Sequence, residues 1–145
     1  MKRILRSRAG AISIVCIVAL LSLFLGVRHS VSGLYRDVAD AKYNAAEQVI
    51  IISKGYPRVD VGSLTDSSRT LRNLSLSNSA TVTDYRAAMA LADDDFLNVC
   101  DDLYKELLTG DGKRDLDRYR SSYIASSLRI TPFVENFLVR LFAIN

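Results

Sequence analysis

The 145-residue sequence lacks tryptophan and has only one histidine, two cysteines and two prolines. The scarcity of cysteine excludes a disulfide-stabilised scaffold. The scarcity of proline, together with only seven glycines, excludes collagen-like and low-complexity chains. Disorder is also excluded, because 49% of the residues are hydrophobic and enough apolar surface is available for a core. We therefore expect a folded chain with one domain.

The basic charge of the chain is concentrated at its start. The sequence has 19 basic and 16 acidic residues, a formal net charge of +3, and a pI near 9.0. Four of the basic residues, Lys2, Arg3, Arg6 and Arg8, lie in residues 1–8, and the segment 9–27 has no charge. The remaining 15 basic residues therefore face 16 acidic ones, a net charge of −1. Because this part has no basic face, nucleic acid is not an expected partner.

Residues 9–27 form an uncharged run rich in Ile, Val, Leu and Ala. As a helix this run is about 28 Å long, close to the ~30 Å hydrocarbon core of a bilayer. It predicts a transmembrane helix, with the lipid bilayer as its partner. The positive-inside rule then predicts a single-pass protein of the cell membrane, with residues 1–8 cytoplasmic and residues 28–145 extracytoplasmic. The alternative is a signal peptide cleaved after Ser32, which would release a secreted domain; the length of the run and the positions of Arg28 and His29 favour an uncleaved anchor.

The rest of the sequence predicts an all-α fold, because apolar residues recur at helical spacing and no alternating pattern of useful length is present. We expect the membrane helix to continue into residues 31–53 as the first helix of an antiparallel three- or four-helix bundle. The inward stripe predicted for this helix is Leu34, Val38, Ala41, Ala45, Val49 and Ile52. The clearest helix has an a/d pattern, which serves packing within the chain or self-association. Its members are Val82, Tyr85, Met89, Ala92, Phe96, Val99 and Leu103.

Capping and turn signals set the expected helix ends. Ser63 with Asp66, and Thr81 with Asp84, have the spacing of capping boxes at the starts of two helices. A Gly-Asp-Gly turn at residues 110–112 predicts that the next helix, about 114–129, returns antiparallel. The inward residues expected on that helix are Leu116, Tyr119, Tyr123, Ile124 and Leu128.

The C-terminal segment is strongly apolar for a chain end. Thr131 and Pro132 are suited to the N-cap and first position of a terminal helix. This helix carries Phe133, Val134, Phe137, Leu138, Leu141 and Phe142. Two interpretations remain open. The helix docks on the bundle as its last packing element, or it lies on the membrane surface with its polar residues toward water.

No residue pattern marks a catalytic or cofactor site. His29 lies at the membrane edge without a partner motif, and Cys16 lies in the span. Cys100 lies one position off the a/d stripe, and a bilayer boundary separates it from Cys16, so neither a disulfide nor a metal pair is expected. The Gly-Lys pair at residues 112–113 lacks the other residues of a phosphate loop. We therefore predict no enzyme activity, no cofactor and no metal.

Five carboxylates form the one notable polar cluster. They are Asp93, Asp94, Asp95, Asp101 and Asp102. The cluster contains no glycine, unlike a calcium loop of the EF-hand type. Residues seven apart on a helix are separated by about 10.5 Å of rise, which is too far for two such carboxylates to share one ion. We interpret the cluster as a solvated acidic face that binds a basic surface of a partner protein.

Several scattered features resemble the bacterial LemA family. A first long helix closes with Lys54-Gly55-Tyr56, the penultimate helix carries Tyr119 and Tyr123, and Pro132 precedes an apolar tail with Leu138, Leu141 and Phe142. The chain resembles a divergent member, since it has no tryptophan in the first helix. The resemblance implies a membrane-anchored helical bundle of unassigned biochemical role, with no catalytic residues to transfer.

Two functions remain in competition. The first is a scaffold or protein-interaction module that binds another protein of the bacterial cell envelope. The alternative is an extracytoplasmic ligand-binding bundle of the sensor type. Because only eight residues precede the span, such a sensor needs a separate signalling partner.

Overall fold

The computed structural model of this chain describes residues 2–107, 111–131 and 134–141, with side chains from Val15 onward except at 135, 136 and 141. The all-α prediction is confirmed, since every regular element in these ranges is helical. Four long helices follow one another: α1 (Lys2–Ser53), α2 (Gly62–Leu76), α3 (Val82–Glu106) and α4 (Asp111–Ser127). A π-helical turn, η1 (Val134–Leu138), then leads into the short α5 (Val139–Leu141).

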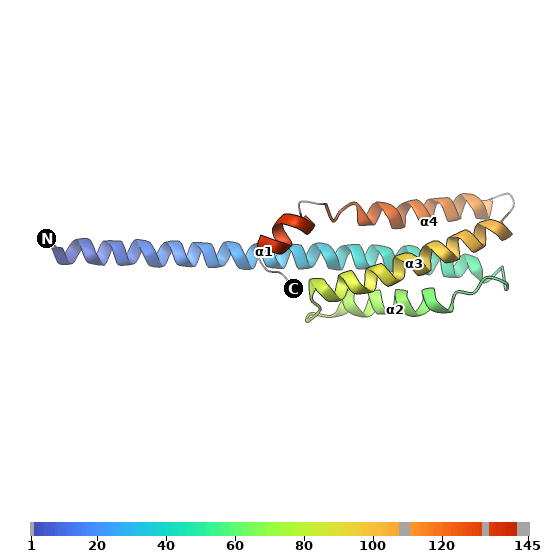
Figure 1. Cartoon of the computed structure of the whole chain (residues 1–145), viewed down its shortest axis with the longest axis horizontal. Coiled ribbons are helices and arrows are strands. Elements are labelled where there is room, and N and C mark those ends of the chain that lie inside the picture. Colours follow the sequence, from blue (N-terminus) through green and yellow to red (C-terminus); the bar gives the residue numbers. More distant parts are fainter. Residues whose placement is uncertain (1, 108–110, 132–133, 142–145) are drawn as a thin grey trace.

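Helix α1 is continuous through its 52 residues, which corresponds to a rod about 78 Å long. Figure 1 shows its N-terminal half extending alone, while its C-terminal half runs beside α2, α3 and α4. Each of the four helices is antiparallel to the next along the chain. The predicted continuation of the apolar helix into the folded domain is therefore present. The basic side chains of residues 2–8 lie outside the described ones.

The exposed half of α1 is strongly apolar, as a membrane span or a signal sequence is. From residue 15 to residue 25 its large aliphatic side chains are all more than half exposed: Val15, Ile17, Val18, Leu20, Leu21, Leu23 and Leu25. A contiguous apolar surface of this size is unfavourable in water. The helix is long and apolar enough to cross a membrane. Val31 is the first buried residue of α1, and Val27, at the predicted end of the span, is already partly buried against the same core.

The buried face of α1 is wider than the predicted stripe. Val38, Ala45 and Val49 are buried as expected, whereas Leu34 and Ile52 are only partly buried. Other residues are buried that the stripe did not include: Val31, Tyr35, Ala39, Lys42, Ala46 and Ser53. The physical reason is that both α2 and α4 pack on α1, so two sides of the helix are covered.

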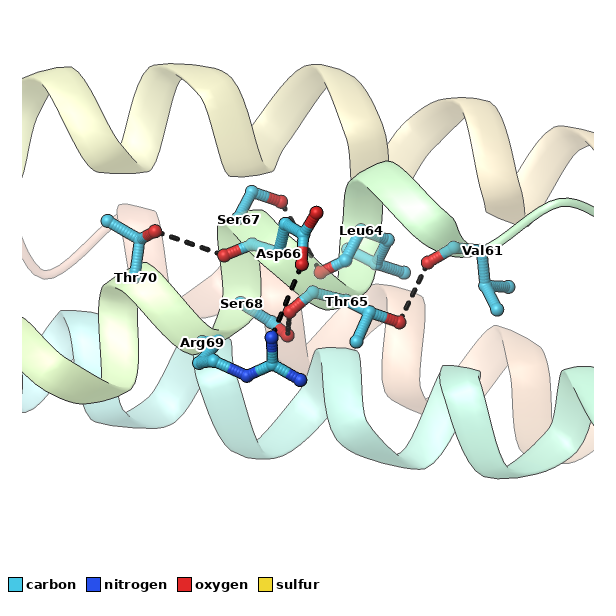
Figure 2. Close-up of polar contacts among 8 residues, drawn as sticks. All are labelled: Val61, Leu64, Thr65, Asp66, Ser67, Ser68, Arg69 and Thr70. Carbon is cyan, nitrogen blue, oxygen red and sulfur yellow. Dashed lines mark hydrogen bonds and ion pairs between the residues drawn. The ribbon is translucent and has the colours of Figure 1, made fainter.

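Helix α2 starts differently from the prediction. The capping box of Ser63 and Asp66 is wrong, since the N-cap residue is Val61 and its side chain makes no capping hydrogen bond. Instead, the backbone N–H of Gly62 donates to Asp60 Oδ1 at 2.9 Å. Asp66 forms an ion pair with Arg69 one turn later, at 3.4 Å (Figure 2).

Hydroxyl side chains along α2 bond to the helix's own backbone. Thr65 Oγ1 donates to the carbonyl of Val61 at 2.8 Å, and Thr70 Oγ1 donates to that of Asp66 at 3.0 Å (Figure 2). Ser68, which is buried, donates to the carbonyl of Thr65 at 3.0 Å. These bonds satisfy the hydroxyls within the helix. Small serines can therefore face the core, which explains how a serine-rich segment packs as a helix.

Helix α3 agrees closely with its sequence signals. The capping box is confirmed: Thr81 Oγ1 accepts from the Asp84 N–H at 3.2 Å, and Asp84 Oδ2 accepts from the Thr81 N–H at 2.8 Å. All seven a/d residues from Val82 to Leu103 are buried. The helix ends at Glu106. Gly110 lies outside the described residues, and Asp111 and Gly112 belong to α4, which begins three residues before the predicted start.

Helix α4 buries only part of its predicted face. Leu116 and Tyr123 are buried and Tyr119 is partly buried, but Ile124 and Leu128 are 47% and 74% exposed. The prediction for the last two is wrong because α4 packs chiefly on α1 and leaves much of its α3 side uncovered.

The C-terminal segment docks on the bundle rather than standing away from it. Val139 is buried, and Val134 and Leu138 pack on the same cluster as Tyr35 and Tyr85. Thr131 Oγ1 accepts from the Val134 N–H at 3.4 Å, as an N-cap residue would. The expected regular helix is replaced by the π-helical turn η1. Pro132, Phe133 and Phe142 lie outside the described residues.

Candidate functional site

The seam between α3 and α4 is closed at one end and open at the other. At the end far from the apolar half of α1, the Tyr104 hydroxyl donates to Asp117, and Arg120 lies 3.9 Å from Asp101. Toward the other end the helices separate, and two cavities of about 290 and 100 Å³ lie along the seam. Lys42 and Asp93 line both cavities, so this pair is the centre of the candidate site.

Lys42 reaches the seam from α1. Its side chain is 2% exposed, and its Nζ donates to Asp93 Oδ1 of α3 at 2.5 Å. The ammonium also lies 4.2 Å from the centroid of the Tyr123 ring of α4, a cation–π distance. A buried charge is tolerated only where it is paired. Here three helices supply the charge and its two partners.

The ammonium retains hydrogen-bonding capacity. It has three N–H donors, and Asp93 provides the one hydrogen bond that it makes within the described part of the chain. The Asp93 side chain is 42% exposed, so its carboxylate also meets solvent at the seam. The pair is therefore anchored in the core on the lysine side and accessible on the carboxylate side.

Tyr123 forms the wall of the site on α4. Its ring stacks on Phe96, with centroids 3.7 Å apart and an interplanar angle of 7°. Its hydroxyl is buried and has no hydrogen-bond partner in the described ranges. Burial, and secondarily the nearby Asp93 charge, raises the pKa of this phenol far above its ordinary value. The Tyr123 hydroxyl therefore stays neutral even in alkaline solution.

The larger cavity extends from Lys42 toward Arg86 and Tyr35, whose side chains are joined by a hydrogen bond of 3.3 Å from Arg86 Nε to Tyr35 Oη. The smaller cavity lies between Leu97 and Ile124, both more than one-third exposed. The two cavities thus combine cationic donors, the Asp93 carboxylate and an apolar rim. This combination suits binding of a polar group carried on an apolar body.

The five predicted carboxylates do not share one environment. Asp93 is paired with Lys42 in the seam, Asp101 faces Arg120, and Asp102 forms an ion pair with Lys105 at 2.7 Å. Asp94 is exposed and Asp95 is partly buried. Successive aspartates on a helix point in different directions, whereas residues seven apart, as Asp94 and Asp101 are, lie on one face. No metal-ligand cluster occurs among the described residues.

Sequence reasoning missed Lys42 and its pairing with Asp93. The available signal was the position of Lys42 between apolar residues of the α1 stripe, because a lysine at a core position requires a counter-ion. Its partner lies 51 positions away, and no local spacing indicates it.

The remaining candidates from the sequence have simpler roles. Cys100 is completely buried, and burial raises the pKa of its thiol to about 12, so the thiol is neutral. Cys16 is exposed on the apolar half of α1. His29 is exposed on α1 beside the point where the bundle begins.

Comparison with known proteins finds no family model that matches this chain, and neither a curated protein nor a solved structure is similar to it.

Proposed function

We propose that this chain is a LemA-like, membrane-anchored helical bundle that serves as a scaffold or protein-interaction module in the bacterial cell envelope, without catalysis. In this proposal residues 9–27 span the cell membrane, residues 1–8 are cytoplasmic, and the bundle binds an envelope partner outside. The observation that carries the proposal is the unbroken helix α1, which joins an exposed apolar half to a half packed in the bundle. Such a rod holds a binding surface at a fixed height and orientation above a bilayer.

The α3–α4 seam supports a protein as the partner. Leu97 and Ile124 are exposed along it, although they are large aliphatic residues. The exposed carboxylates of Asp94 and Asp101 lie on the same helix α3. An apolar centre with a charged rim is the usual composition of a binding interface. The complementary partner is a segment that carries apolar and basic side chains.

Site-specific photocrosslinking in cells tests this assignment. A photoreactive residue at Ile124 should capture one defined protein, while the same residue at Thr70, exposed on α2, should not. Neutralising Asp94 and Asp101 with asparagine should reduce capture at Ile124 if the acidic rim attracts the partner. Identical products at both positions, or no product at Ile124, would contradict a seam interface.

A second candidate function is a ligand-binding sensor, favoured by the cavities beside Lys42 and the unpaired Tyr123 hydroxyl. A small carboxylate with an apolar body would match the Lys42 donors. Screening such carboxylates against the full chain in nanodiscs should then reveal a rise in melting temperature that Tyr123→Phe weakens. The absence of any ligand-dependent shift would leave only the scaffold.

A further inference from the structure

A cavity of about 540 Å³ lies where the bundle begins, between α1 and the loop that joins α2 to α3. Its α1 wall carries Arg28, His29 and Arg36, and its loop wall carries Ser79 and Thr81. These residues are distinct from the α3–α4 seam. No acidic side chain lines this cavity in the described part of the chain.

The lining of this cavity on α1 follows one face of the helix. Leu25, Arg28, Ser32 and Arg36 are spaced by three or four residues, which brings them into one row, and His29 lies beside Arg28 at the edge of this row. The row starts on the exposed aliphatic half of α1 and continues into the bundle. With residues 9–27 in the bilayer, the apolar end of the row meets acyl chains and the basic end lies at the level of the headgroups.

The guanidinium group of Arg36 has a donor that makes no hydrogen bond within the described part of the chain. Its Nε is buried and makes no hydrogen bond to any described residue, while its Nη2 donates to the Ser77 carbonyl at 3.4 Å. Asp84 of α3 lies three residues after Thr81 of the cavity lining. It accepts hydrogen bonds from the backbone N–H and the hydroxyl of Thr81, both at 2.8 Å. Both bonds use Oδ2, and they lower the pKa of Asp84. Because no acidic side chain of the described residues lines the cavity, the guanidinium groups of Arg28 and Arg36 are available for an external anion.

We propose that this cavity binds the phosphate of an anionic phospholipid headgroup in the leaflet next to the bundle. The inference rests on the proposed membrane anchorage of the chain. Arg28 and Arg36 bind the phosphate oxygens as charge-assisted donors, and the hydroxyls of Ser32 and Ser79 supply further donors. A lipid is favoured over free phosphate because the exposed aliphatic half of α1 adjoins the cavity at Leu25 and offers acyl chains a surface.

The test uses the full chain reconstituted in nanodiscs of phosphatidylcholine alone or of phosphatidylcholine with phosphatidylglycerol, with melting followed by circular dichroism. A ligand that binds the folded state raises the melting temperature, and we expect a rise of about 5 °C in the anionic discs. The double variant Arg28→Gln/Arg36→Gln should lose most of this rise. The control Arg129→Gln, an exposed arginine outside the cavity, should keep it.

The other outcomes distinguish a phospholipid site from general surface attraction, from a free-anion site and from a failure of membrane anchorage. An equal loss in the Arg129 control would show general surface attraction and overturn the site. An equal rise when inorganic phosphate is added to phosphatidylcholine discs would make the site one for free anions and overturn the lipid assignment. A chain that enters nanodiscs but shows no anion-dependent shift refutes only this inference, whereas a chain that fails to enter nanodiscs refutes the membrane anchorage itself.

Discussion

Removing the carboxylate of Asp93 should destabilise the bundle far more than removing the charge of Lys42. Asp93→Ala leaves a buried ammonium without its only hydrogen-bonded counter-ion among the described residues. Breaking a fully buried pair in this way costs about 3–5 kcal/mol. The Asp93 side chain is 42% exposed, so water reaches the site and partly compensates the ammonium. We therefore expect a loss of about 2–3 kcal/mol, in the range of a hydrogen bond to a charged group.

Lys42→Met should change the free energy of unfolding only slightly. Methionine retains an unbranched apolar stem of similar length, and the remaining Asp93 carboxylate is already half exposed and becomes solvated. Replacing a buried charge with an apolar side chain of similar volume is often close to neutral, so we expect a cost below about 1 kcal/mol. The double variant should resemble Lys42→Met, because the second substitution then removes an unpaired surface carboxylate.

Urea unfolding of the full chain in detergent micelles, followed by far-UV circular dichroism, measures these differences as a double-mutant cycle. Asp94→Ala is the matched control, since Asp94 is exposed on the same helix and should change stability by less than about 0.5 kcal/mol. Equal losses for the two single variants, or a larger loss for Lys42→Met, would refute the burial argument.

Three further predictions concern single side chains. Thr81→Ala should cost about 1 kcal/mol by removing the α3 cap, measured by the same unfolding assay, and an unchanged stability would show that the cap contributes nothing. The folded pKa of Asp84 is lowered from 3.8, so its stabilising effect is present above that value and disappears as the pH falls through the folded pKa. The difference in unfolding free energy between the natural chain and Asp84→Asn should therefore disappear in acid. A difference that stays constant with pH would contradict this. In a Cys16→Ser background, Cys100 should resist a thiol reagent at pH 8 until urea unfolds the chain, since its thiol is buried with a pKa of about 12, and rapid native labelling would contradict the burial.

Local sequence signals predicted those parts of the fold that depend on residues close in the chain. The Thr81–Asp84 cap and the a/d stripe of α3 formed as expected, because both rest on spacings of three or four residues within one helix. The continuity of α1 followed from the helical spacing of its apolar residues and from the absence of proline before residue 57. The Ser63–Asp66 cap failed because Asp60 satisfies the first N–H of α2, and Asp66 pairs with Arg69.

Features that depend on packing between helices were not predictable from spacing. Ile124 and Leu128 have a helical spacing suited to a core, but both are exposed, Ile124 at the rim of the smaller seam cavity. The Lys42–Asp93 pair joins residues 51 positions apart, and only the packing of α1 on α3 brings them together. Within the acidic cluster of α3, packing brings Asp93 and Asp101 to partners on other helices, whereas Asp102 pairs with Lys105 one turn along α3.

The topology of the anchored bundle is the central claim, and one labelling measurement tests it most directly. Ser122 is exposed on α4 and suits a cysteine probe. In a Cys16→Ser background, Ser122→Cys should react with a membrane-impermeant thiol reagent in intact cells, in a chain that remains in the membrane fraction. Reaction only after lysis would place the bundle in the cytoplasm and contradict the proposed envelope partner.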